Sequence, residues 1–260
     1  MHISKSDIKH LRSLSQKKVR EAEKQFVVEG WKALKDALNA GSQILFVAVT
    51  AKHLANPDYR PIIREIESRS IGLKEIDEVE LRRVSDTVHA QGVVALLRQR
   101  TYEFDQKHLD DASLLVFADR IADPGNLGSI VRTSDWFAVD CLILSEGCVE
   151  LHNEKVVRST SGSIFHVPII EHAETAATLS RLRELGFKVI VTAAEGKTSY
   201  ARADYGAKNV IVLGSEASGI DPSARGQADV TVKIPLVGRA ESLNVGVACG
   251  IVLSHLRNKG

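Results

Sequence analysis

Apolar residues follow two different spacings along this chain, and the change falls near residue 100. Helical spacing is expected at residues 5–24, 31–38, 62–66 and 79–84. Short apolar runs typical of strands occur at residues 26–29, 44–49 and 93–97. The pattern predicts a small unit of alternating helices and strands over residues 1–98, with no evident catalytic cluster.

After residue 98 the pattern changes twice. Residues 99–112 are polar and lack apolar periodicity, which is typical of a linker. Continuous apolar runs then follow at residues 114–118, 141–144, 164–170, 189–191, 210–213 and 230–234, with helical segments between them at 127–137 and 173–185. Strands that alternate with helices predict an α/β domain over residues 113–260, in which a mostly parallel sheet is covered by helices on both faces. Functional residues in such domains follow the carboxyl ends of the strands.

Composition limits the class of protein. No apolar run is long enough to span a membrane, so no membrane association is expected. The N-terminus is polar and lacks the apolar core of a signal peptide. The three cysteines, Cys141, Cys148 and Cys249, are odd in number and lack metal-ligand spacing. These features favour a reduced cytoplasm and argue against a structural metal site.

The formal net charge of the chain is +1, but charge is unevenly distributed. Residues 1–24 hold seven lysines and arginines against three acidic residues. This segment is either a solvated helical face or a contact for nucleic acid. No aromatic residues are interleaved with the charges, so the sequence leaves both interpretations open.

The first apolar run of the second half leads into Asp119–Gly128. Pro124 and Gly125 predict a turn, and Asn126 is placed to cap the helix that follows. Arg132 lies six residues further on, so both polar side chains can face one strand-end cleft. The alternative is a turn, a helix cap and a surface arginine.

The run at residues 210–213 leads into Gly214–Gly219, which is close to a dinucleotide-binding fingerprint. Glu216 stands where that fingerprint needs a glycine. A carboxylate there repels phosphate, which argues against NAD and ATP. The segment suits a ligand with positive charge and no phosphate, or it is a plain strand-to-helix turn.

Two further segments are candidates. In residues 153–163 a helix would place Lys155 and Arg158 on one face, as a solvated pair or as a phosphate contact. In residues 234–250 a loop enters a helix at Ser242, Leu243 and Asn244, with Ser242 placed to cap it. Gly246 and Gly250 each destabilise a helix by about 1 kcal/mol, so close approach of a backbone or a ligand is expected there.

Three of these segments resemble the signature motifs of the SpoU/TrmH family of RNA 2′-O-ribose methyltransferases. They are residues 123–132, 212–219 and 234–248, and they stand in the order and spacing that the family shows. Residues 156–168 resemble the segment between the first two motifs. The N-terminal unit, with residues 26–30 and 91–94, resembles the family's small RNA-binding domain, which is similar to a ribosomal protein.

The resemblance implies a SPOUT fold with a C-terminal trefoil knot and a homodimer with sites at its interface. It implies bound S-adenosylmethionine and methyl transfer to a ribose 2′-hydroxyl, in 23S ribosomal RNA more than in transfer RNA. A catalytically silent RNA-binding homologue is the other alternative. The implied reaction-site residues are Asn126, Arg132, Glu216, Ser242 and Asn244, and the implied cofactor contacts are Thr192, Gly214, Ile234, Leu236 and Leu243.

Arg132 has two possible roles in such a reaction. It is a base in a dry pocket, or a clamp that binds the adjacent phosphate and positions the hydroxyl. A guanidinium normally stays protonated, which favours the clamp. Lys155 and Arg158 are the expected RNA contacts.

Overall fold

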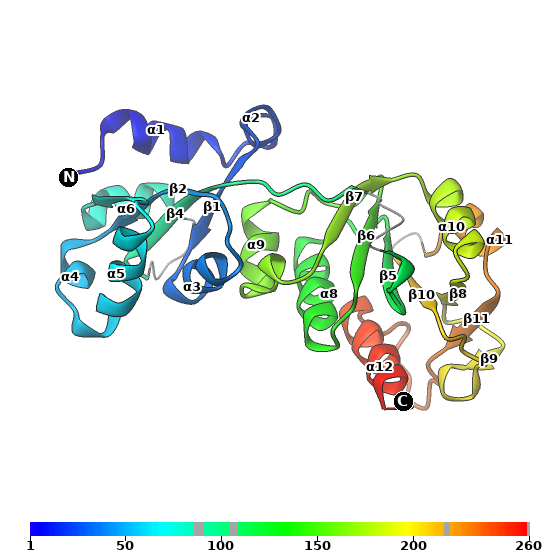
Figure 1. Ribbon diagram of the computed structural model, residues 1–260. Helices are drawn as coiled ribbons and strands as arrows, with labels where there is room; N and C mark the ends of the chain where they lie inside the picture. The colour runs from blue at the N-terminus through cyan, green and yellow to red at the C-terminus, as the bar shows by residue number, and fades with distance from the viewer. Residues whose placement is uncertain (86–90, 104–108, 216–218, 259–260) are drawn as a thin grey trace. The chain divides into compact units, whose positions relative to one another are not determined.

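The computed structural model describes residues 1–85, 91–103, 109–215 and 219–258 (Figure 1). The chain divides into two compact units, and each is described by itself. The first unit comprises Met1–Arg100 with His152–Phe165, and the second comprises Thr101–Leu151 with His166–Gly260. Residues 152–165, which the sequence suggests are part of the second domain, thus pack with the first unit.

The first unit is an α/β sandwich around a four-stranded sheet. Its helices and strands are α1 (Lys5–Ser13), α2 (Lys17–Glu23), β1 (Gln25–Glu29), α3 (Trp31–Asn39), β2 (Ile44–Val49), α4 (Ala51–Leu54), η1 (Pro57–Tyr59), α5 (Arg60–Ser68), β3 (Gly72–Glu75), α6 (Glu78–Val84), β4 (Val93–Arg98), α9 (Glu154–Thr160) and η2 (Ser163–Phe165). The strand order is β1-β4-β2-β3. Strand β4 runs antiparallel to both neighbours, and β2 and β3 are parallel.

Alternate residues of β4 show how the sheet is covered. Ala95 packs in a core with Leu34 of α3 and Val157 of α9. Val94 packs in a second core with Leu11 of α1 and helix α6. Helix α9 therefore supplies part of the core of the first unit, although in sequence it lies between two strands of the second.

The second unit is built on a seven-stranded sheet. Its helices and strands are β5 (Leu114–Asp119), α8 (Pro124–Trp136), β6 (Cys141–Ser145), β7 (Ile169–Ala173), α10 (Thr175–Glu184), β8 (Lys188–Thr192), β9 (Thr198–Ser199), η3 (Tyr200–Arg202), β10 (Asn209–Gly214), α11 (Pro222–Gly226), β11 (Val230–Lys233) and α12 (Val245–Arg257). The order is β7-β6-β5-β10-β8-β11-β9. Every neighbouring pair is parallel. The predicted α/β class with a mostly parallel sheet is confirmed.

Helices cover both faces of this sheet. Val212 of β10 packs in a core with Leu182 of α10 and Ala224 of α11. Ile211 and Leu213 point to the opposite face and are buried as well. On that face α12 contacts β10 and lies against α8 (Figure 1). Strand β10 lies in the middle of the strand order, so the loop that follows it leaves from the middle of the sheet's carboxyl edge.

One predicted strand starts later than expected. The apolar run at residues 164–170 contains the short helix η2, and β7 begins at Ile169. Pro168 has no N–H to donate to a neighbouring strand, so the strand begins directly after it. Phe165 instead stacks with Phe26 of the first unit, with ring centroids 6.4 Å apart.

Candidate active site

A cavity of about 790 Å³ lies in the second unit where several strands end. Because the sheet is parallel, the loops after β8, β10 and β11 leave at the same edge. These loops and the start of α12 form the wall of the cavity. The residues that the sequence predicts as cofactor contacts all line it: Thr192, Gly214, Ile234, Leu236 and Leu243. The structure therefore brings together five residues from three separate stretches of chain.

The wall combines an apolar surface with polar groups. Ile234, Leu236 and Leu243 line it together with Val245 of α12. The hydroxyl of Thr192 donates to the backbone oxygen of Val212 at 2.9 Å, so it is held at the end of β8. A mostly apolar wall with a few fixed polar groups is typical of a small-molecule site of this size.

An ion pair at the cavity joins two residues that lie outside the sequence motifs. Arg225 of α11 pairs with Glu195, which follows β8, and both line the cavity. A hydrogen bond from its own backbone and one from Arg225 hold the pKa of the Glu195 carboxyl below its usual range. The two residues lie thirty positions apart and belong to no short motif, so no sequence signal identifies them.

Gly214 permits the loop after β10 to fold back on itself. A Cβ at this position would lie 2.6 Å from Ile220 Cδ1 and 2.7 Å from the backbone oxygen of Gly219. The backbone N–H of Gly219 donates to Ser215 at 2.8 Å and closes the loop. Glu216, predicted as a reaction-site residue, lies outside the described residues.

The helix that follows the cavity starts later than predicted. Helix α12 begins at Val245, and its N-cap is Asn244, whose Oδ1 accepts from the backbone N–H groups of Gly246 at 2.9 Å and Val247 at 3.3 Å. The prediction that Ser242 caps this helix is wrong. Ser242 lies in the preceding loop, is exposed, and lines the cavity.

The cap of α8 also differs from the prediction. Asp123 is the N-cap, and its Oδ1 accepts from the backbone N–H of Asn126 at 2.8 Å. Pro124 occupies the first helical position, where its fixed φ favours a cap one residue earlier. The side chain of Asn126 is therefore not needed as a cap. Its Oδ1 accepts a hydrogen bond from Asn244 Nδ2 at 2.7 Å, which links the first and third motifs.

Helices α8 and α12 run side by side in the same direction. One turn or less after Asn126 and Asn244, the two helices pack closely, because a Cβ at Gly246 would lie 2.9 Å from Ser129 Cβ. At the far end, Arg257 Nε donates to the backbone oxygen of Phe137 at 2.7 Å. The sequence predicts close approach of a backbone or a ligand at Gly246, and the structure places the side chain of Ser129 on α8 there.

Arg132 lies on α8 and is exposed. Within the described part of the chain it has no ion-pair partner. It lies about one and two-thirds helical turns after Asn126. Its guanidinium is therefore available to a bound anion.

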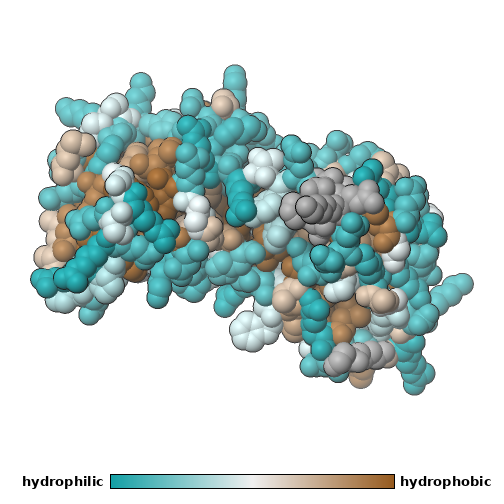
Figure 2. Space-filling view, viewed as in Figure 1, coloured by the Kyte–Doolittle hydropathy of each residue, from teal (hydrophilic) through white to brown (hydrophobic). Residues whose placement is uncertain are grey.

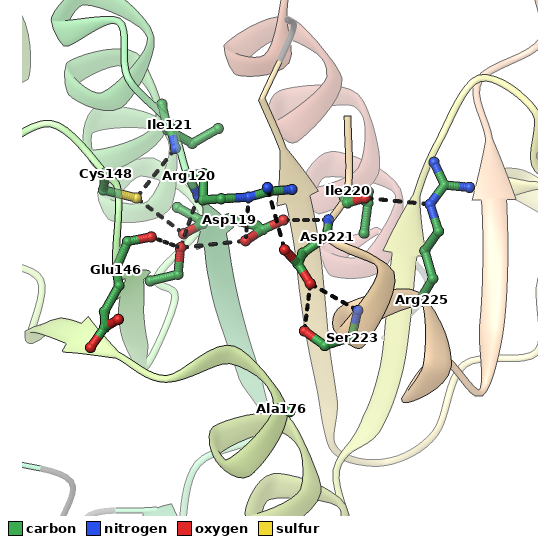
Figure 3. A network of polar contacts seen from close by, with 12 residues as sticks. Asp119, Arg120, Ile121, Glu146, Cys148, Ala176, Ile220, Asp221, Ser223 and Arg225 are labelled. Atoms are coloured by element: carbon green, nitrogen blue, oxygen red, sulfur yellow. Dashed lines mark hydrogen bonds and ion pairs between the residues drawn. The ribbon is translucent and has the colours of Figure 1, made fainter. Parts of the chain in front are cut away.

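A buried carboxylate ties the loop after β5 to the segment after β10. Asp119 is fully buried, and its Oδ2 accepts from the backbone N–H of Asp221 at 2.7 Å. Arg120 lies between the two carboxylates, with Nε 3.5 Å from Asp119 Oδ1 and Nη1 3.3 Å from Asp221 Oδ2 (Figure 3). Hydrogen bonds from Ser223, with a smaller effect of Arg120, hold the pKa of the Asp221 carboxyl below its usual range. This network ties the loop that precedes Asn126 to the segment that precedes α11.

The predicted RNA contacts Lys155 and Arg158 lie on α9 in the first unit. Asn153 caps this helix by accepting from the backbone N–H of Lys155 at 2.9 Å. Lys155 is exposed, and Arg158 lines a second cavity of about 260 Å³ between α9, β1 and α3. The structure thus groups them with residues of the first unit, and the sequence prediction had placed them in the second domain.

Among the described residues, one surface group of three metal-ligand side chains occurs, His2, Asp77 and Glu80. Asp77 caps α6, and His2 Nε2 lies 3.7 Å from Glu80 Oε2, so these side chains have structural partners. In the part of the chain that the structure describes, none of the helices has the length and apolarity to cross a membrane. Hydrophilic side chains cover most of the face shown in Figure 2.

Comparison with known proteins decides the family. The sequence profile of the SpoU rRNA Methylase family matches residues 113–254, more than half of the chain. The chain belongs to the SpoU rRNA methylase family. The profile of the MRM3-like substrate binding domain matches residues 5–95 of this SpoU methylase.

Individual relatives extend over both units of this SpoU methylase. It is 28% identical over 250 residues to the 23S rRNA (guanosine(2553)-2′-O)-methyltransferase RlmP of Bacillus subtilis, covering 96% of this chain and 95% of the relative. The crystal structure of an AdoMet-bound rRNA methyltransferase from Sinorhizobium meliloti matches with a TM-score of 0.88 and 29% identity, covering 100% of this chain and 97% of the other. The TrmH/SpoU tRNA modifying enzyme of A. aeolicus matches with a TM-score of 0.51 and 30% identity, covering 59% of this chain and 81% of the other.

Proposed function

We propose that this protein transfers a methyl group from AdoMet (S-adenosylmethionine) to a ribose 2′-hydroxyl of ribosomal RNA. The observation that carries the proposal is the cavity of the second unit, in a chain of the SpoU family. All five predicted cofactor contacts line it, and Asn244 beside it is hydrogen-bonded to Asn126.

The cavity fits AdoMet in size and in chemistry. Ile234, Leu236 and Leu243 offer an apolar surface to an adenine ring, and Thr192 offers a hydroxyl. Glu195 and Arg225 supply one negative and one positive group, which suit the amino and carboxylate ends of a methionine chain. When bound, AdoMet supplies a methyl group activated by a positively charged sulfur.

The reaction needs the ribose hydroxyl held in line with that methyl group, and alignment is a major source of acceleration in such transfers. Arg132 is exposed on α8. An exposed guanidinium remains a cation, so we assign Arg132 the role of binding the phosphate next to the reacting ribose. A base in a dry pocket is the alternative that this exposure disfavours.

The amide of Asn126 is oriented by its hydrogen bond from Asn244, which leaves its Nδ2 group to donate to the substrate. Ser242 is exposed at the cavity and offers a hydroxyl next to these amides. Glu216 is retained as a reaction-site residue on its motif position alone, since it lies outside the described residues.

Ribosomal RNA is favoured over transfer RNA as the substrate. The rRNA methyltransferases align along nearly the whole chain, whereas the tRNA modifying enzyme covers little more than half of it. The first unit is therefore shared with enzymes whose names specify ribosomal RNA. We place the activity in the cytoplasm, and the free thiols of Cys141, Cys148 and Cys249 suit a reducing compartment.

We infer that the enzyme is a homodimer and that α8 and α12 form the interface. Three large apolar side chains are exposed on or beside these helices: Trp136 at 83%, Val247 at 50% and Leu243 at 45%. Exposed large apolar residues are typical of an interface, and tryptophan is among the residues that contribute most to binding there. A Trp136→Glu variant that sediments as a monomer would support this, and one that stays dimeric would contradict it.

Calorimetric titration with S-adenosylhomocysteine, NAD and ATP tests the cofactor assignment. We expect binding of S-adenosylhomocysteine alone. Leu236→Lys should raise its Kd about tenfold, since a loss of about 1.4 kcal/mol of apolar contact corresponds to that factor. Val79→Lys, at an exposed apolar residue of the first unit, is the matched control. Binding of NAD or ATP in place of S-adenosylhomocysteine would overturn the assignment, and binding without methyl transfer would favour a silent RNA-binding homologue.

A further inference from the structure

A charged depression of about 610 Å³ lies on the first unit between α1 and α6. It is separate from the methyl-transfer cavity, which belongs to the second unit. Four basic side chains line it: Lys5, Lys9, Arg12 and Arg83. We call it the α1–α6 groove. Three of the seven basic residues of the N-terminal segment, which the sequence alone leaves as either a solvated face or a nucleic-acid contact, thus line one groove.

The cations on α1 share one side of the helix. At about 100° per residue, Lys5, Lys9 and Arg12 fall within an arc of about 60°, and Asp7 lies on the opposite side. Asp7 pairs there with Lys74, at 2.8 Å between the carboxylate and Nζ. The acidic residue of α1 therefore does not neutralise the cations in the groove.

No ion pair among the described residues neutralises these cations. Lys5, Lys9, Arg12 and Arg83 are all exposed, and none has an ion-pair partner in the described part of the chain. Two carboxylates also line the groove, Glu80 and Glu154. Glu80 Oε2 lies 3.7 Å from His2 Nε2. Like charges at helical spacing destabilise a helix, so an anionic partner would relieve a repulsion that the fold leaves in place.

The other lining groups specify which anion fits. Ser13, Ser15 and Gln16 line the groove at the end of α1. The two hydroxyls donate to the backbone oxygens of His10 and Arg12, so the side-chain amide of Gln16 is the donor that the groove offers beside its cations. Amide groups beside lysine and arginine are typical contacts to phosphate and sugar. No aromatic residue is among the groove's described lining residues. Single-stranded binding sites generally stack bases on aromatic side chains, so this groove suits the backbone of a structured RNA.

We propose that the α1–α6 groove binds the phosphodiester backbone of double-helical RNA, with Lys5, Lys9, Arg12 and Arg83 contacting its phosphates. The proposal rests on an RNA substrate as proposed above, and it adds a docking surface remote in sequence from the methyl-transfer motifs. It assigns this surface to shape and charge recognition, without readout of base identity.

The test compares two triple variants of the full-length protein. The groove variant is Lys9→Gln, Arg12→Gln, Arg83→Gln. The control variant is Lys52→Gln, Arg60→Gln, Arg64→Gln, which removes the same charge from exposed positions on α4 and α5 of the same unit. Glutamine has nearly the helix propensity of lysine and arginine, so both should fold as the parent does, and thermal unfolding checks this. Affinity for an RNA duplex, and for a single strand of the same length, is measured by fluorescence anisotropy over a range of salt concentrations.

We expect the slope of log K against log salt for the duplex to fall by about 1 for each lost phosphate contact, thus by about 3 in the groove variant and by far less in the control. Equal slopes for the two variants, or a larger loss for the single strand than for the duplex, would overturn the proposal. Binding of S-adenosylhomocysteine by the same samples separates the two questions. A protein that binds no S-adenosylhomocysteine but shows the expected change in slope would refute the proposed methyl transfer and still support RNA binding by the groove.

Discussion

Asn244 Nδ2 donates a hydrogen bond of 2.7 Å to Asn126 Oδ1, while Asn244 Oδ1 accepts the first N–H groups of α12. The capping hydrogen bonds therefore fix the orientation of the Asn244 amide, and the Asn244 amide in turn fixes the orientation of the Asn126 amide. Because Asn126 Oδ1 accepts this bond, we expect its Nδ2 group to be the one that donates to the substrate. Two motifs more than a hundred residues apart thus act as one hydrogen-bonded unit.

Substitutions of Asn244 separate its two roles. Asn244→Asp keeps an oxygen that caps α12 but places a second acceptor against Asn126 Oδ1, so we expect nearly parental stability and a large loss of kcat. Asn244→Ala removes the cap as well and should lower the unfolding free energy by about 1 kcal/mol. Urea denaturation and methyl-transfer assays on both variants check this. Full activity in Asn244→Asp would show that the amide pair has no part in the reaction.

The two glycines of α12 are expected to respond in opposite ways to alanine. A Cβ at Gly246 would lie 2.9 Å from Ser129 Cβ, so overpacking of about 1–3 kcal/mol should outweigh a gain in helix propensity of about 1 kcal/mol. A Cβ at Gly250 would lie 3.8 Å from Thr133 Cγ2, an ordinary contact. Gly250→Ala should therefore stabilise the protein by up to about 1 kcal/mol. Thermal unfolding of both variants measures the difference, and equal effects would contradict the packing argument.

Replacement of Arg132 tests the phosphate clamp. Arg132→Ala should lower kcat/KM by about 10²-fold, because a ribose that is not held in position reacts slowly. Arg132→Lys keeps a cation and should recover part of this loss. Binding of S-adenosylhomocysteine, measured by calorimetry, should stay unchanged in both. An Arg132→Ala variant that methylates at the parental rate would remove this residue from the mechanism.

The stability of the protein should fall in mild acid because of His152. Burial, with a smaller effect of Arg20 and Lys24, lowers its pKa from 6.5 to about 3. The unfolded chain therefore binds a proton below about pH 6.5 that the folded chain excludes, so stability is complete above that pH and is lost as the pH falls toward 3. At about pH 5 the loss is about 2 kcal/mol.

A His152→Phe variant is the control for this pH effect. His152 packs edge-on against Phe26, with ring centroids 4.7 Å apart, so an aromatic ring is tolerated in shape. Urea denaturation at neutral and acidic pH should show that the variant loses about 2 kcal/mol less than the parent on acidification. The same loss in both proteins would mean that other groups cause it.

Much of the second unit follows from its sequence. Strands such as β5 and β10 are buried on both faces, so their sequences are continuous apolar runs, and these runs predict the strands. The predicted cofactor contacts lie together because parallel strands end at one edge. Their grouping was expected from motif positions, and their roles stay a prediction.

Other features depend on tertiary contacts that no local pattern contains. Helix α9 packs with the first unit because Val157 completes a core there, and because Lys32 Nζ donates to the backbone oxygen of Ser161 at 2.5 Å. Asn244, and not Ser242, caps α12, and the side chain of Asn244 is also hydrogen-bonded to Asn126. The cap at Asp123, in contrast, can be predicted from the sequence. Proline favours the first helical position, so Pro124 indicates that the residue before it is the cap. The trefoil knot stays a prediction of the family resemblance.

The central claim is tested most directly by transfer of a labelled methyl group from AdoMet to purified 23S ribosomal RNA, with transfer RNA as the comparison. A methyl group on a ribose 2′-oxygen blocks alkaline cleavage of the following phosphodiester, so the position can be read from the hydrolysis pattern. We predict labelling of ribosomal RNA at an alkali-resistant linkage and none of transfer RNA. Label on a base, label on transfer RNA alone, or no transfer to either RNA would contradict the account.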